Sequence, residues 1–233
     1  MDTKVKGIII KLSNYKEADK LASIFSFEQG IITAKFTGVK KEKAKFKAVA
    51  QPFCFADFVL NTKAGTNTVT SANIIDNFFG ITANYNKTIC AYIVLDILQS
   101  ILPKQKEEPE IFVLTIKALK DIEQKNEYIS LIDFILQFIK FSGMQVEFDC
   151  NNTILLDKDT GNFTSQKSLW TVPIDKKVYN LLKQINDSSE EDDKDATLEK
   201  TEYPETVLKQ ALRLTNNIML AKFGVELKTF VYI

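Results

Sequence analysis

The side chains of this chain that could bind a ligand through charge are mostly lysines. The segment Lys40-Lys41-Glu42-Lys43-Ala44-Lys45-Phe46-Lys47 holds five lysines in eight residues, and Lys35 lies just upstream. If this segment is extended, side chains alternate between two sides, and one side carries Lys41, Lys43, Lys45 and Lys47. A row of cations binds a phosphate backbone favourably because counterions are released. The pattern predicts a nucleic-acid-binding segment, and the alternative is an ordinary solvated loop in a lysine-rich chain.

Aromatic side chains are the second ingredient of single-strand binding, because nucleotide bases stack on them. Phe46 stands between two lysines and is the aromatic residue that we test first, although core packing is the alternative for it and for the phenylalanines of the neighbouring apolar segments. The predicted nucleic-acid-binding residues are therefore Lys35, Lys40, Lys41, Lys43, Lys45, Phe46 and Lys47.

Catalytic constellations are not found in the sequence. The chain has no histidine, which excludes Ser-His-Asp and Cys-His arrangements. Neither of the glycine-rich phosphate-binding motifs, G-x-x-x-x-G-K-[ST] and G-x-G-x-x-G, is present. The run Glu190-Glu191-Asp192-Asp193 lies in a polar stretch, whereas paired catalytic carboxylates need a rigid, partly buried setting. We expect a protein that is not an enzyme.

Cysteine usage and charge limit the remaining classes of protein. Cys54, Cys90 and Cys150 are far apart, which favours reduced thiols and no bound zinc or other cofactor. The start of the chain lacks the layout of a signal peptide, and the most apolar stretch, 128–144, is interrupted by polar residues. We therefore expect a cytoplasmic, nucleoid-associated protein. The formal net charge is zero, but residues 1–80 hold 12 lysines against 7 acids, and the remainder is acidic.

The first 80 residues have the pattern of short strands with glycine and asparagine turns between them. The expected strands are residues 6–12, 21–27, 31–36, 53–60 and 69–75. Five such strands with a long third connection are typical of the oligonucleotide-binding (OB) barrel. The basic segment falls in that long connection.

Helical periodicity begins after residue 80. We expect helices over 88–102, from Pro109 to about 122, over 128–141, 178–185 and 204–223, the third being apolar nearly all round and therefore central. The predicted fold class is α+β, an N-terminal five-stranded OB-fold barrel followed by a helical bundle with a small β-hairpin insertion. The expected domains are 1–80, the barrel; 81–145, the bundle; 146–172, the hairpin; and 173–233, C-terminal helices with an acidic linker near 187–202.

The order of several short motifs resembles the RecO family of bacterial recombination mediators. The opening Lys6-Gly7-Ile8-Ile9-Ile10 is followed by Thr37-Gly38-Val39-Lys40-Lys41, by Gln51-Pro52-Phe53 and, near the end, by Phe223-Gly224-Val225-Glu226-Leu227-Lys228-Thr229. The resemblance covers residues 5–145, with a shorter stretch at 212–230. Many members carry a four-cysteine zinc module after the bundle, and here only Cys150 stands near that place. The resemblance therefore implies that the hairpin is a degenerate zinc module.

The resemblance implies a function. Such proteins bind single- and double-stranded DNA, anneal complementary strands, contact RecR and the C-terminal tail of single-strand-binding protein, and help to load RecA at gaps. The alternative from another class is a protein-interaction scaffold with an OB-like barrel and no direct nucleic-acid role. Salt-dependent binding of an oligonucleotide separates the two.

Overall fold

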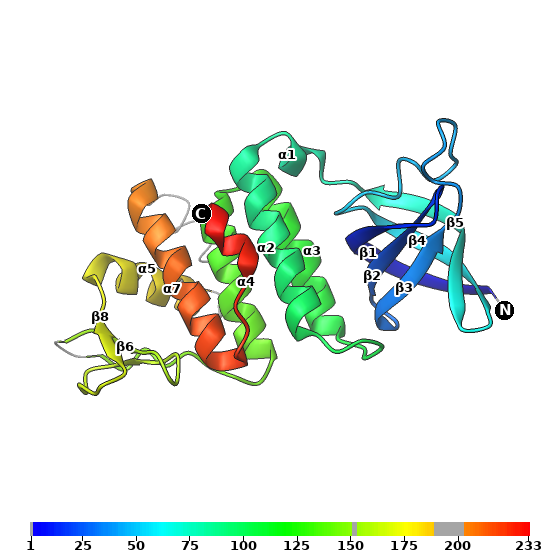
Figure 1. Ribbon diagram of the computed structural model, residues 1–233. Helices are drawn as coiled ribbons and strands as arrows, with labels where there is room; N and C mark the ends of the chain where they lie inside the picture. The colour runs from blue at the N-terminus through cyan, green and yellow to red at the C-terminus, as the bar shows by residue number, and fades with distance from the viewer. Residues whose placement is uncertain (1, 151–152, 189–202) are drawn as a thin grey trace. The chain divides into compact units, whose positions relative to one another are not determined.

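The computed structural model describes residues 2–150, 153–188 and 203–233. The chain forms two compact units: Met1–Gly80 with Leu95–Val113, and Ile81–Val94 with Leu114–Ile233. Figure 1 labels the elements of both units. The division into four domains that the sequence suggests stays a prediction.

The first unit contains a closed five-stranded barrel (Figure 1). Its strands are β1 (Asp2–Tyr15), β2 (Asp19–Ser26), β3 (Gly30–Phe36), β4 (Phe55–Lys63) and β5 (Thr66–Asp76). The order around the barrel is β1-β2-β3-β5-β4, and every pairing is antiparallel except the short parallel one between β3 and β5. This confirms the predicted OB-like barrel followed by helices.

The strand bounds differ from the expected ones where the backbone leaves the extended conformation. Phe53 was expected to begin the fourth strand, but its φ is +68°, so the strand begins at Phe55. The β4–β5 hairpin turns at Ala64 and Gly65, both with positive φ, as a two-residue hairpin turn that matches strand twist requires. The first strand is longer than expected, because it pairs with β4 from Asp2 onward and with β2 as far as Tyr15.

The barrel interior is filled by apolar side chains from all five strands. Ile9, Ile24, Phe36, Phe58 and Leu60 are buried in one cluster. The outside of the barrel also carries apolar residues, which pack within the same unit on the segment Leu95–Val113. Phe25 and Phe55 there meet Phe112 edge-on, with ring centroids 5.4 and 6.1 Å away.

Gly30 permits a close approach between β3 and the segment that follows the first long helix. Its φ is +65°, and a Cβ there would lie 1.9 Å from the carbonyl oxygen of Lys106. Gln105 donates its backbone N–H to the carbonyl oxygen of Ile31 at 3.2 Å, and Ile31 forms a parallel bridge with Lys104. Any larger residue at position 30 would push these segments apart.

The helices are α1 (Phe79–Thr82), α2 (Tyr85–Ile101), α3 (Pro109–Gln124), α4 (Glu127–Phe141), α5 (Lys176–Ser188), α7 (Glu205–Phe223) and the 3₁₀ helix η1 (Lys228–Tyr232). Helix α4 is buried on nearly every side, as its sequence predicts, with α5 and α7 packed against it. Asn126 caps its N-terminus by accepting the N–H groups of Tyr128 and Ile129, both at 3.1 Å.

The hairpin expected at 146–172 is instead a three-stranded sheet. Its strands are β6 (Leu155–Asp157), β7 (Phe163–Thr164) and β8 (Thr171–Pro173), in the order β7-β6-β8. The third strand forms because the chain turns back at residues 168–171 and pairs again with β6. Helix α5 continues to Ser188, so the first two residues of the expected acidic linker are helical, and 189–202 lie outside the described residues.

Candidate nucleic-acid interface

The basic segment lies in the β3–β4 loop, residues 37–54, which is a chain of turns and not an extended strand. Lys41 donates its backbone N–H to Gly38, Ala44 to Lys41 and Lys47 to Ala44, over 3.1–3.2 Å. The expected alternation of lysines along one side is therefore wrong. A backbone N–H that donates to the carbonyl oxygen three residues earlier closes a turn, so the segment is not extended.

The loop is anchored at both ends to the barrel. Val39, Val49 and Ala50 are buried in the barrel core. Near the loop's start, Gly38 donates its N–H to Asp19 Oδ1 at 2.8 Å, and the backbone N–H of Lys40 donates to the carbonyl oxygen of Ala18 at 3.0 Å. The apolar anchors hold the loop on the barrel, so the charged side chains between them remain in solvent.

The loop lysines differ in their engagement. Within the part of the chain that the structure describes, the ammonium groups of Lys41, Lys43 and Lys47 take part in no ion pair or hydrogen bond, and all three residues are exposed. Lys40 Nζ donates to the carbonyl oxygen of Lys16 at 3.3 Å. Lys45 Nζ donates to the carbonyl oxygen of Thr70 at 3.4 Å. Three ammonium groups are thus available for a phosphate backbone without breaking an existing contact.

The aromatic residue predicted to stack on bases is partly committed to the barrel. Phe46 is half-buried and meets Phe36 edge-on, with centroids 5.9 Å apart, while Lys45 Nζ lies 5.1 Å from the Phe46 ring centroid. Lys35 lies on β3, half-buried, opposite Leu21 of β2.

The β1–β2 turn, which contacts the start of this loop, carries a further aromatic and a further cation. Tyr15, at the end of β1, is 38% exposed, and Lys16 Nζ lies 5.5 Å from its ring centroid. The carbonyl of Lys16 holds Lys40. Sequence reasoning on the basic segment missed both residues, because they lie more than twenty positions away and only the β1–β2 turn brings them near.

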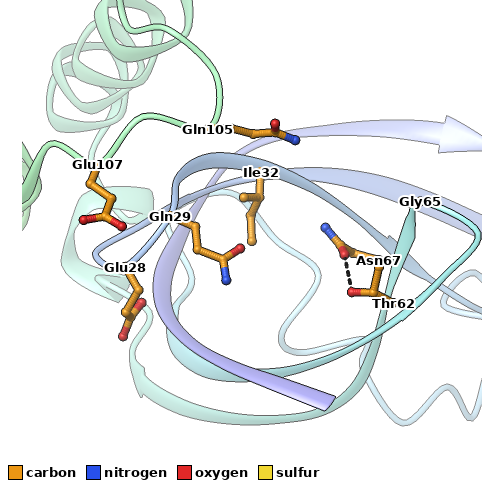
Figure 2. A pocket seen from close by; sticks show the side chains of 8 residues that line it. All are labelled: Glu28, Gln29, Ile32, Thr62, Gly65, Asn67, Gln105 and Glu107. Atoms are coloured by element: carbon orange, nitrogen blue, oxygen red, sulfur yellow. Dashed lines mark hydrogen bonds between the residues drawn. The ribbon is translucent and has the colours of Figure 1, made fainter. Parts of the chain in front are cut away.

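A hollow of about 390 Å³ lies elsewhere on this unit, where the β2–β3 and β4–β5 turns face the segment after α2 (Figure 2). Thr62 Oγ1 donates to Asn67 Oδ1 at 2.7 Å on its wall. Its lining contains two carboxylates and no cation. The lining residues are Glu28, Gln29, Ile32, Thr62, Gly65, Asn67, Gln105 and Glu107. Such a lining repels phosphate, so we do not assign nucleic-acid binding to it.

The cysteines of the described residues do not form a ligand set for a structural zinc ion. Cys54 and Cys90 are buried, and burial raises the pKa of their thiols to about 11 and about 12. Cys150 precedes the three-stranded sheet, and among the described residues no group of three or more His, Cys, Asp or Glu side chains could hold a metal ion. Within the same residues, none of the helices has the length and hydropathy needed to cross a bilayer.

Two family models match the chain in sequence order. Residues 1–78 match the model described as Recombination protein O N terminal, and residues 83–229 match Recombination protein O C terminal. The boundary between the two falls between β5 and α2.

Curated relatives agree with these models. "DNA repair protein RecO" of Bacillus subtilis (strain 168) is 25% identical over 163 residues, 70% of this chain and 64% of the relative. The Clostridium perfringens (strain 13 / Type A) protein of that name is 27% identical over 199 residues, 78% of this chain and 79% of the relative. The Oceanobacillus iheyensis protein of the same name is 30% identical over 141 residues, which are 60% of this chain and 55% of the relative. The chain thus spans less than two thirds of the length of two of these three relatives.

Proposed function

Because the chain belongs to the RecO family, we propose that it is a non-catalytic DNA repair protein that binds single- and double-stranded DNA through the β3–β4 loop. In this proposal it anneals complementary strands and helps to load RecA on gaps coated with single-strand-binding protein. Its protein partners would be a RecR-like protein and the C-terminal tail of single-strand-binding protein.

The observation that carries the DNA-binding part is the arrangement of charge on the loop. Five lysines and a single acid, Glu42, lie between apolar anchors that fix the loop on the barrel. Lysine is a compact point charge suited to phosphates, without the planar fork that arginine uses to read base edges. We therefore expect binding that is largely independent of sequence and weakens steeply with salt.

The residues predicted from the sequence take different roles in this proposal. Lys41, Lys43 and Lys47, whose ammonium groups bond to nothing in the described residues, contact phosphates directly. Lys40 and Lys45 can do so by exchanging a backbone carbonyl for a phosphate oxygen. Phe46 keeps the middle of the loop on the barrel through its contact with Phe36. Lys35 and Lys16 extend the positive surface beside the loop.

The test compares the parent chain with a loop variant that carries Lys41→Ala, Lys43→Ala and Lys47→Ala. Affinity for a labelled single-stranded oligonucleotide is measured by fluorescence anisotropy, and annealing of two complementary strands is followed separately. We expect the loop variant to bind at least about tenfold more weakly near physiological salt, since three phosphate contacts are removed, and to anneal more slowly.

A matched control replaces three exposed lysines outside the loop, Lys120, Lys183 and Lys228, with alanine. The control carries the same change in net charge, so a loss confined to the loop variant identifies a local contact. Equal losses of affinity in both variants would show that binding depends on the net charge of the chain and not on the loop. A parent chain without salt-dependent binding would favour the protein-interaction scaffold.

A further inference from the structure

The turn between β7 and β8 exposes two large apolar side chains next to each other. Leu169 is 98% exposed and Trp170, the single tryptophan of the chain, is 64% exposed. Scattered apolar residues on a surface are ordinary, but an adjacent leucine and tryptophan that the unit leaves uncovered are a candidate contact surface.

Hydrogen bonds within the turn order the backbone that carries these side chains. The backbone N–H of Ser168 donates to Thr171 Oγ1, and Thr171 Oγ1 donates back to the carbonyl oxygen of Ser168, both at 3.0 Å. The N–H of Trp170 donates to Ser168 Oγ at 3.1 Å. A ring presented by an already ordered backbone loses little conformational entropy when a ligand binds.

The sheet that carries the turn is itself firmly packed in its unit. The rings of Phe148 and Phe163 stack at 4.9 Å, and Tyr179 of α5 meets Phe163 edge-on at 5.1 Å. Lys222 of α7 donates to Asn162 Oδ1 at 2.6 Å. The exposed turn therefore projects from a rigid base.

A lysine is paired with the tryptophan through the backbone. The N–H of Lys158 donates to the carbonyl oxygen of Trp170 at 3.0 Å, which continues the β6–β8 ladder by one pair, so the two residues are opposite each other and their side chains leave the same side. Lys167 is exposed three positions before the tryptophan. Of the two acids beside Lys158, Asp157 accepts the N–H of Asp159 at 2.8 Å, and Asp159 lies exposed in the turn.

We propose that Trp170 is a stacking platform for an unpaired nucleotide base, with Lys158 contacting the neighbouring phosphate. An aromatic face beside a cation matches the alternation of base and phosphate in a single strand, and stacking tolerates every base. The ligand class rests on the proposed function, but the site belongs to the second unit and uses none of the residues of the β3–β4 loop.

The lone tryptophan makes the test local, because its emission reports only position 170. The full-length chain is titrated with oligo(dT), which has bases to stack, and with inorganic polyphosphate, which has charge alone. We expect saturable quenching of the emission by oligo(dT) and none by polyphosphate. Equal quenching by both would overturn stacking, and quenching by an acidic peptide with an apolar end but not by oligo(dT) would assign the surface to a protein partner instead.

Affinity measurements on variants give a second readout. Trp170→Ala is expected to weaken oligo(dT) binding by roughly 5- to 150-fold, because stacking on one aromatic ring contributes about 1–3 kcal/mol, and Trp170→Phe should retain most of the affinity. Tyr232→Ala is the matched control, because Tyr232 of η1 is 65% exposed. A loss for Tyr232→Ala as large as that for Trp170→Ala would contradict the assignment.

The loop variant separates this proposal from the function on which it rests. In that variant, oligo(dT) should bind more weakly but still quench Trp170 at saturation. If the parent binds oligo(dT) with unchanged emission and Trp170→Ala binds equally well, the stacking site is refuted and the loop interface stands. If the parent does not bind oligo(dT), the proposed function fails together with this site.

Discussion

The small sheet should be held by its aromatic cluster without a metal, and replacing Phe163 tests this directly. The Phe163 side chain is 2% exposed and contacts the rings of Phe148 and Tyr179, which also contact each other. Burial raises the pKa of Tyr179, so its hydroxyl stays protonated and donates to the carbonyl oxygen of Phe148 at 3.0 Å. Phe163→Ala removes the most closely packed ring of this three-ring cluster.

The magnitude follows from burial and geometry. Truncating a fully buried phenylalanine to alanine destabilises a protein by about 3–5 kcal/mol. If the sheet opens as a local unit, amide protection falls by the same free energy, roughly a hundredfold or more at about 1.4 kcal/mol per factor of ten. Tyr179→Phe keeps the ring and loses only one hydrogen bond, so it should cost about 1 kcal/mol.

Hydrogen exchange read at single amides is the assay. The reporters are the N–H groups of Lys158 and Ile174, which bond across β6 and β8 to Trp170 and Ile154. We expect these amides to lose protection in Phe163→Ala and to be unchanged when a chelator is added to the parent. Protection that survives the substitution, or that a chelator removes from the parent, would refute the reasoning; about one zinc per chain in elemental analysis would do so independently.

The remaining expectations concern salt, the helical core and the thiols. In a salt series, the loop variant should flatten the log–log dependence of single-strand affinity by about two units, since each phosphate contact contributes about −0.7; an unchanged slope would show that these lysines do not touch phosphate. Phe134→Asp should unfold the second unit, because Phe134 is fully buried in α4 and an unpaired buried charge costs several kcal/mol; a folded variant with the parental melting temperature would contradict the placement of that core. With a thiol reagent at pH 8 the native chain should show one fast-reacting cysteine, Cys150, because burial raises the pKa of Cys54 and Cys90 to about 11 and about 12 and their thiolates form only at higher pH; fast reaction of all three thiols without denaturant would oppose this.

Local patterns were sufficient for the main elements of the fold. The five N-terminal strands and the helices α2, α3, α4, α5 and α7 follow from periodicity, because a buried face repeats every two residues in a strand and about every 3.6 in a helix. The short helices α1 and η1 were not predicted. The apolar residues of α4 surround the helix, so its central place was predictable from the sequence alone. The position of the lysine run in the third connection was predictable for the same reason, since the strands on either side delimit it.

Tertiary contacts decided the form of the candidate sites. The lysine run could be extended or turned, and the buried anchors Val39 and Val49 favour the turns by drawing the loop onto the barrel. Nothing local marks Tyr15 and Lys16 as neighbours of this loop, because the contact depends on how β1 and β2 pair. Tryptophan is a residue type common in protein cores. Trp170 is exposed because it lies in the turn before β8, and the position of that turn depends on the pairing of β8 with β6. Sequence periodicity thus determined which segments are strands and helices, whereas long-range pairing determined which side chains remain in contact with solvent.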